Sequence, residues 1–93
     1  MIVVFTDAAR ADLEEIHAYI AGGSLERAQD VVAMIQLATE RLAPFPESGR
    51  PGRRAGTREL VLPRLPYILP YRVIGERVMI LRVQHTSRQW PDR

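Results

Sequence analysis

The chain has 93 residues, contains no cysteine and carries a formal net charge of +2. This length fits one domain over residues 1–93, and the lack of cysteine excludes disulfide scaffolds, thiolate metal sites and cysteine nucleophiles. No apolar run approaches the roughly 20 residues of a membrane-spanning helix, and residues 1–5 are too short for a signal-peptide core. We therefore expect a cytoplasmic protein that does not enter a membrane.

Charge is distributed unevenly along the chain. Residues 1–43 hold seven acidic and three basic residues, whereas residues 44–93 hold four acidic and ten basic residues. Every basic residue is arginine, whose planar guanidinium group suits phosphate or carboxylate ligands. A GC-rich genome produces the same arginine bias, so the bias by itself does not identify a partner.

The first half predicts a strand followed by two helices. The apolar run at 2–5 is typical of a strand, and Thr6 can cap the next helix by accepting from its free amides. A second helix is expected after a break at 22–23 and a cap at Ser24, ending by Pro44 and packing antiparallel to the first. The apolar faces expected at helical spacing are Ala9, Leu13, Ile16 and Ile20, then Ala28, Val31 or Val32, Ile35, Ala38 and Leu42.

The second half predicts a loop and three strands. Residues 44–57 contain too much proline and glycine for a helix or a strand, and a strand is expected at 58–62. A hairpin over 67–85 should turn at Gly75-Glu76, where glycine suits a two-residue type II′ turn. Pro70 lacks an amide donor, so its strand should be bulged there or turn that position away from a partner.

This turn sets the pairing of the hairpin and shows that both of its faces are largely apolar. The expected pairs are Val73 with Val78, Tyr71 with Ile80, Arg72 with Met79, Pro70 with Leu81, Leu69 with Arg82, and Ile68 with Val83. A solvated face would alternate apolar and polar residues. We therefore expect the second face to be covered by the helices or by another chain.

The expected fold is α+β, with the order strand, helix, helix and then a three-stranded antiparallel sheet. Its sequence words closely resemble the ParE branch of the RelE/ParE toxin superfamily, and the match covers nearly the whole chain. The words are Thr6-x-x-Ala9-x-x-Asp12-Leu13-x-x-Ile16, Phe45-Pro-Glu-Ser-Gly-Arg50, Arg58-Glu59-Leu60, Tyr67-x-x-x-Tyr71-Arg72-Val73 and Arg82-Val83-x-His85.

The resemblance implies the toxin of a bacterial toxin–antitoxin pair. A small antitoxin, expected to be of the ribbon-helix-helix type, would fold a basic segment onto the toxin and form a hetero-oligomer with it. The toxin would contact operator DNA only through this antitoxin. The expected antitoxin-binding residues are Leu13, Ile16, Ile20, Ile35, Met79 and Leu81. The expected target-binding residues are Arg50, Arg53, Arg54, Arg58, Arg82, His85, Arg88 and Trp90.

The resemblance leaves two activities open, because ParE relatives inhibit DNA gyrase whereas RelE relatives cut mRNA, mostly on the ribosome. RNA cleavage without a metal needs a base, an acid and fixed cations. The candidate catalytic residues for that reaction are Glu59, Arg72, Arg82 and His85. However, Ile68 stands where the cutters have arginine and Thr86 where some have tyrosine, so the resemblance favours a gyrase inhibitor that is not an enzyme. A third hypothesis is that the chain has lost its toxicity and retains only antitoxin binding or joint operator repression.

Each candidate also has a structural interpretation. Glu59 can form an ion pair or anchor a loop, and His85 can be a hydrogen-bonded residue at the end of a strand. The loop arginines can simply be solvated, and Trp90 can anchor an interface or cover the sheet. His17 has no partner at ligand spacing, so we expect no metal and no cofactor.

Overall fold

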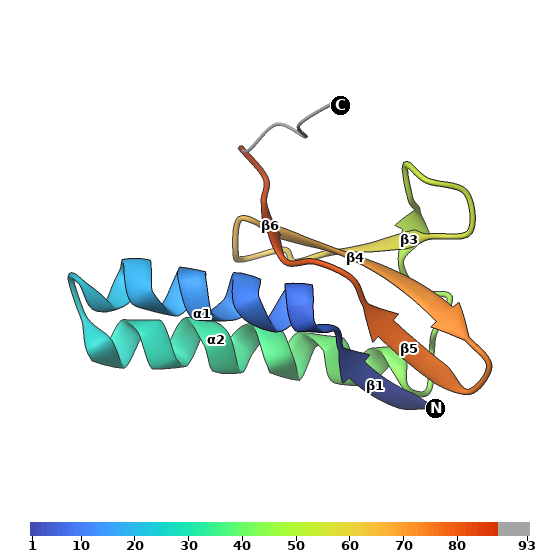
Figure 1. Cartoon of the computed structure of the whole chain (residues 1–93), viewed down its shortest axis with the longest axis horizontal. Coiled ribbons are helices and arrows are strands. Elements are labelled where there is room, and N and C mark those ends of the chain that lie inside the picture. The colour runs from blue at the N-terminus through green and yellow to red at the C-terminus, as the bar shows by residue number, and fades with distance from the viewer. Residues whose placement is uncertain (88–93) are drawn as a thin grey trace.

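The computed structural model describes residues 1–87 and shows an antiparallel pair of helices beside a mixed sheet (Figure 1). The elements in chain order are β1 (Ile2–Phe5), α1 (Asp7–Ala21), α2 (Leu25–Thr39), the 3-10 turn η1 (Glu40–Leu42), β2 (Arg50–Pro51), β3 (Arg58–Val61), β4 (Tyr67–Ile74), β5 (Arg77–Ile80) and β6 (Gln84–His85). The expected α+β class and element order are confirmed. Neither described helix is long and apolar enough to cross a membrane.

Both helices begin at the expected caps. The Thr6 hydroxyl accepts from the Ala9 amide and the Ser24 hydroxyl accepts from the Arg27 amide, which satisfies one free donor at each helix start. The second helix ends earlier than expected. After Thr39 the chain tightens into η1, and Pro44, which has no amide, cannot donate a further helical hydrogen bond.

The sheet has the strand order β1-β5-β4-β3-β2, with β6 paired to β4. The three expected antiparallel strands are β3, β4 and β5, and β1 adds to β5 in parallel. The sequence does not predict the two-residue strand β2, and it places Gln84–His85 at the end of the second hairpin strand and not in the separate strand β6. The expectation that residues 44–57 contain no strand is therefore wrong at Arg50–Pro51, which pairs with Arg58 and Glu59.

The hairpin follows its expected register only as far as Ile80. Gly75 has a φ of 60° at the turn, and Tyr71 pairs with Ile80 as expected. Beyond that point Leu81 donates its amide to the Pro70 carbonyl, but Ile68 pairs with Gln84. The segment 81–83 thus contains one residue more than the facing part of β4. It lies opposite Pro70, which has no amide hydrogen to donate.

Two expected pairs of the hairpin are therefore wrong. Ile68 does not pair with Val83, and Leu69 does not pair with Arg82, because the strand is interrupted between β5 and β6. The irregularity lies on the strand opposite Pro70. This interruption frees Arg82 and Val83 from the β4 ladder and makes them available to α1.

The helices cover one face of the sheet. Tyr67, Leu69 and Tyr71 alternate along β4 and are buried in the core with residues of both helices, whereas Arg72 and Ile74 are exposed. The buried core consists of Ala9, Leu13, Val31, Ile35, Leu42, Leu60, Leu62, Tyr67, Leu69, Tyr71, Val78, Ile80 and Val83. The second face, which we expected to be covered, faces away from the helices and is called the open face below.

Candidate functional site

The loop before β2 is held by the side chain of Tyr71. Tyr71 is fully buried, and its hydroxyl donates to the Pro46 carbonyl at 2.7 Å and accepts from the Gly49 amide at 2.9 Å. The Arg58 guanidinium donates to the carbonyls of Glu47 and Gly49. Residues 46–49 are therefore shaped by β3 and β4 although they contain no helix or strand.

Glu59 is a buried carboxylate that is already paired. Its side chain is 7% exposed and accepts from the Arg50 guanidinium, from Nε at 3.0 Å and from the terminal nitrogen at 2.9 Å. Because this carboxylate joins β3 to Arg50 of β2, the geometry supports the structural interpretation of Glu59 as a loop anchor.

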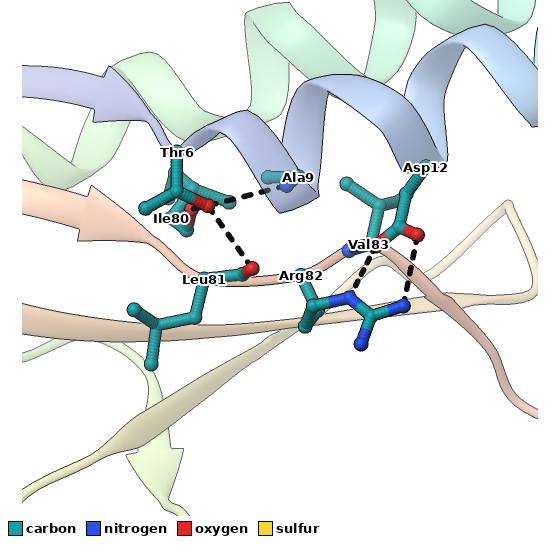
Figure 2. Close-up of polar contacts among 7 residues, drawn as sticks. All are labelled: Thr6, Ala9, Asp12, Ile80, Leu81, Arg82 and Val83. Atoms are coloured by element: carbon teal, nitrogen blue, oxygen red, sulfur yellow. Dashed lines mark hydrogen bonds and ion pairs between the residues drawn. The ribbon is translucent and has the colours of Figure 1, made fainter.

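Asp12 ties α1 to the interruption between β5 and β6. Its carboxylate accepts from Arg82 Nε at 2.8 Å, from a terminal nitrogen of Arg82 at 3.0 Å and from the Val83 amide at 2.8 Å (Figure 2). The hydrogen bonding of Arg82 to the Asp12 carboxylate raises the pKa of the Arg82 guanidinium. At the cap of the same helix, the Thr6 hydroxyl lies within 3.1 Å of the carbonyls of Ile80 and Leu81. The start of α1 thus holds the whole segment 80–83.

His85 lies on the helix side of the sheet, where its ring makes an edge contact with Tyr67 at a centroid distance of 5.5 Å. The Ser87 amide donates to His85 Nδ1 at 3.2 Å, so the neutral ring carries its proton on Nε2 by this hydrogen-bond assignment. Both rings line a groove of about 380 Å³ between α1 and the sheet. The groove is lined by Asp12, Glu15, Ile16, Tyr19, Tyr67, Val83, His85 and Ser87.

The candidate nuclease residues fall on both faces of the sheet. Arg82 contacts α1, and His85 lines the groove beside α1. Arg72 is exposed on the open face, and Glu59 shares that face because it alternates with the core residue Leu60. The fold therefore does not bring these four residues together around one point.

A family model described as the ParE toxin of the type II toxin–antitoxin system parDE matches residues 3–90. The chain belongs to the ParE toxin family. A Sinorhizobium fredii protein named "Putative toxin Y4kP" is 53% identical over 80 residues, spanning 86% of this chain and 82% of that protein. Toxin RelE2 of Caulobacter vibrioides is 40% identical over 86 residues, spanning 92% of this chain and 96% of that protein.

Two solved structures share the fold of this ParE-family toxin. A chain of the chromosomal ParDE toxin–antitoxin system of P. aeruginosa has a TM-score of 0.84 and 32% identity, covering 94% of the toxin and 97% of that chain. A chain of the toxin–antitoxin complex RelBE2 from Mycobacterium tuberculosis has a TM-score of 0.62 and 34% identity, covering 90% of the toxin and 95% of that chain. Both the ParE and the RelE names thus occur among relatives of the toxin.

The arginines expected to bind the target of the toxin lie in different environments. Arg50 and Arg58 hold the loop 46–59 together, whereas Arg53 and Arg54 are exposed at its tip. Arg82 is held by Asp12, as described above. The expected target contacts Arg88 and Trp90 lie outside the residues that the structure describes.

The residues expected to bind an antitoxin are partly in the buried core and partly nearer the surface. Leu13 is 7% exposed and Ile35 is fully buried, so both belong to the core and offer no surface to a partner. This corrects the expected surface, because helical spacing identifies an apolar face without telling whether the sheet already covers it. Ile16 and Ile20 remain half-buried on α1. Met79 on β5 and Leu81 after it are half-buried as well.

Sequence reasoning assigned no role to Asp12 or to Tyr19. Asp12 stands in the helical stripe between Ala9 and Leu13, and a carboxylate in an otherwise apolar stripe is a signal for a buried ion pair. Tyr19 is 87% exposed and lines the groove, but nothing in its sequence context distinguishes it from other surface residues.

We expect the stability of the toxin to fall above about pH 10 in a way that depends on Tyr67. Burial raises the pKa of the Tyr67 phenol, and the positive charge of Arg27 opposes this rise. At higher pH the unfolded chain releases this proton before the folded chain does, so unfolding is favoured. Urea unfolding from about pH 8 to about pH 11 should show a smaller loss of stability in Tyr67→Phe. Equal losses in both proteins would contradict this origin.

Proposed function

We propose that this type II toxin inhibits DNA gyrase by binding it and does not cut RNA. The observation that carries the proposal is the division of the candidate catalytic residues between two faces of the sheet. Two of them are also engaged elsewhere, since Glu59 pairs with Arg50 and Arg82 pairs with Asp12. A nuclease site needs its base, acid and cations around one phosphate.

RNA cleavage on the ribosome is the second candidate function. It is supported by the 40% identity to toxin RelE2 and by the likeness to a RelBE2 chain. Within the toxin, His85 is the residue best suited to such chemistry, because its Nε2 proton is fixed by the hydrogen bond at Nδ1. The two functions therefore differ in what they require of His85.

Expression of the toxin without its antitoxin separates the two functions. A gyrase inhibitor should produce gyrase–DNA cleavage complexes and an SOS response, and His85→Ala should remain toxic because no proton transfer is involved. The controls are the uninduced strain and a strain with a resistant gyrase. Ribosome-dependent mRNA cleavage that disappears in His85→Ala would contradict the proposal, and so would unaffected growth under strong induction.

The antitoxin is proposed to bind the groove between α1 and the sheet. The groove combines apolar and aromatic side chains of Ile16, Tyr19 and Tyr67 with the carboxylate of Glu15. Together with the acidic character of residues 1–43, this lining suits an amphipathic segment that carries arginine or lysine. A neighbouring gene for a ribbon-helix-helix protein would supply the candidate, and the toxin would reach operator DNA only through it. A partnership with gyrase also implies a cytoplasmic location.

We expect Tyr19→Ala to weaken antitoxin binding about tenfold or more, because exposed aromatic side chains in a groove are frequent anchors of interfaces. Glu15→Arg should weaken binding further in low salt. The matched control is Leu37→Ala, which removes a 66% exposed apolar side chain from α2 outside the groove lining. Calorimetric titration with the purified antitoxin measures these affinities. Equal affinities of Tyr19→Ala and Leu37→Ala would place the antitoxin elsewhere.

A further inference from the structure

Three strands bring four aliphatic side chains and two arginines together on the open face. Ile2 of β1 lies beside Arg77 of β5, and Arg77 lies opposite Ile74 of β4. In the next row on the same face, Val4 lies beside Met79, which lies opposite Arg72. These two rows define the open-face patch, which consists of Ile2, Val4, Arg72, Ile74, Arg77 and Met79.

The open-face patch is accessible and its charges are unmatched. Ile2 is 65% and Ile74 is 56% exposed, and both arginine side chains are exposed as well. Within residues 1–87, Arg72 and Arg77 form no hydrogen bond or ion pair through their guanidinium groups, and the patch contains no carboxylate. Exposed aliphatic residues gathered around cations are typical of a surface that another molecule covers.

The composition of the patch favours a protein over a nucleic acid as its partner. Surfaces that bind single-stranded nucleic acid pair cations with aromatic side chains that stack on bases, and the patch has no aromatic residue. Contact with other apolar groups is what makes burial of its four aliphatic side chains favourable. Its two guanidinium groups fit carboxylates in bidentate geometry. The complementary surface is therefore apolar with acidic residues around it.

We propose that the open-face patch is the surface with which the toxin binds an acidic, partly apolar region of its protein target. This inference rests on the proposed function, in which that target is gyrase. The patch lies on the side of the sheet away from the acidic helices and from the groove assigned to the antitoxin. The toxin thus presents surfaces of opposite charge to two partners.

The double variant Arg72→Glu/Arg77→Glu tests the inference. Purified wild-type toxin and variant are compared in gyrase supercoiling and gyrase pull-down assays, with antitoxin affinity and melting temperature measured on the same preparations. The variant should require at least tenfold more protein for half-maximal inhibition, while its antitoxin affinity and melting temperature stay unchanged. Ile74→Ser should weaken inhibition without changing any charge. The matched control is Arg41→Glu, which changes an exposed arginine of η1 outside the patch and should behave as wild type.

The outcomes separate this inference from the proposed function. If wild-type toxin inhibits gyrase and Arg72→Glu/Arg77→Glu inhibits it equally well, the open-face patch is not the target surface and only this inference fails. If the double variant loses RNA binding while gyrase inhibition persists, the patch serves a nucleic acid and the inference fails likewise. If wild-type toxin itself leaves gyrase active, both the proposed function and the inference fail.

Discussion

Asp12→Ala should lower the free energy of unfolding of the toxin by about 2 to 4 kcal/mol. The substitution leaves the Arg82 guanidinium and the Val83 amide without the acceptor that they share. The Asp12 side chain is 10% exposed, so water replaces it poorly, whereas the Arg82 side chain is 46% exposed and can be partly rehydrated. The loss of unfolding free energy should therefore be smaller than that for breaking a fully buried ion pair.

Urea unfolding measures this loss, and a second aspartate of α1 provides the control. Asp7 pairs with Arg10 at 2.9 Å, but both side chains are well exposed, so Asp7→Ala should change stability little. Asp12→Asn keeps one carbonyl oxygen and should lie between wild type and Asp12→Ala. Equal stabilities of Asp7→Ala and Asp12→Ala would show that the segment 80–83 is held by other contacts.

Gly49→Ala should destabilise the toxin by about 3 kcal/mol, at the upper end of the range for overpacking. A β-carbon at this position would lie 2.6 Å from two side-chain atoms of Tyr71 and 2.8 Å from the Glu59 carbonyl. Tyr71 is fully buried and cannot turn away without opening the core. The backbone of residues 46–49 would have to move instead, which would break both hydrogen bonds of the Tyr71 hydroxyl.

Thermal or urea unfolding of three variants tests this steric origin. Gly23→Ala is the control, because the nearest atom to its added β-carbon is the Ile20 carbonyl at an ordinary 3.8 Å. The effects of Gly49→Ala and Tyr71→Phe should not add, since the hydroxyl removed by the second is one of the clashing atoms. A Gly49→Ala variant as stable as Gly23→Ala would contradict the close contact.

Local signals account for the parts of the fold that the sequence predicts well. Thr6 and Ser24 cap the helices because a hydroxyl can reach the free amides within one turn, whatever the rest of the chain does. Gly75 likewise fixes the hairpin turn through its own backbone preference, with a φ of 60°. The register near the turn follows directly, which is why Tyr71 and Ile80 are paired as expected.

Longer-range contacts account for what the sequence does not predict. The interruption at 81–83 is stabilised by Asp12, about seventy residues earlier in the chain, and no local pattern reveals that contact. The strand β2 forms because Arg50 reaches Glu59 across the loop that joins β2 to β3. In both cases a charged side chain with a distant partner overrides the local preference of the segment.

The same limit applies to the candidate site. The alternation along β4 correctly separates Arg72 from the helix side, and the apolar second face of the sheet is visible in the sequence. The sequence does not show that Ile35 is covered by the sheet, nor that Tyr19 and His85 share a groove. Spacing identifies faces, whereas the packing of helices on the sheet decides which faces remain accessible.

Supercoiling of relaxed plasmid by purified gyrase, with the toxin added at equimolar and higher ratios, tests whether the toxin inhibits gyrase by binding it. The proposed function predicts loss of supercoiling and accumulation of cleaved DNA linked to gyrase, without any RNA in the reaction. Addition of the antitoxin should restore supercoiling. Full supercoiling activity at a large molar excess of folded toxin would show that the toxin does not inhibit gyrase.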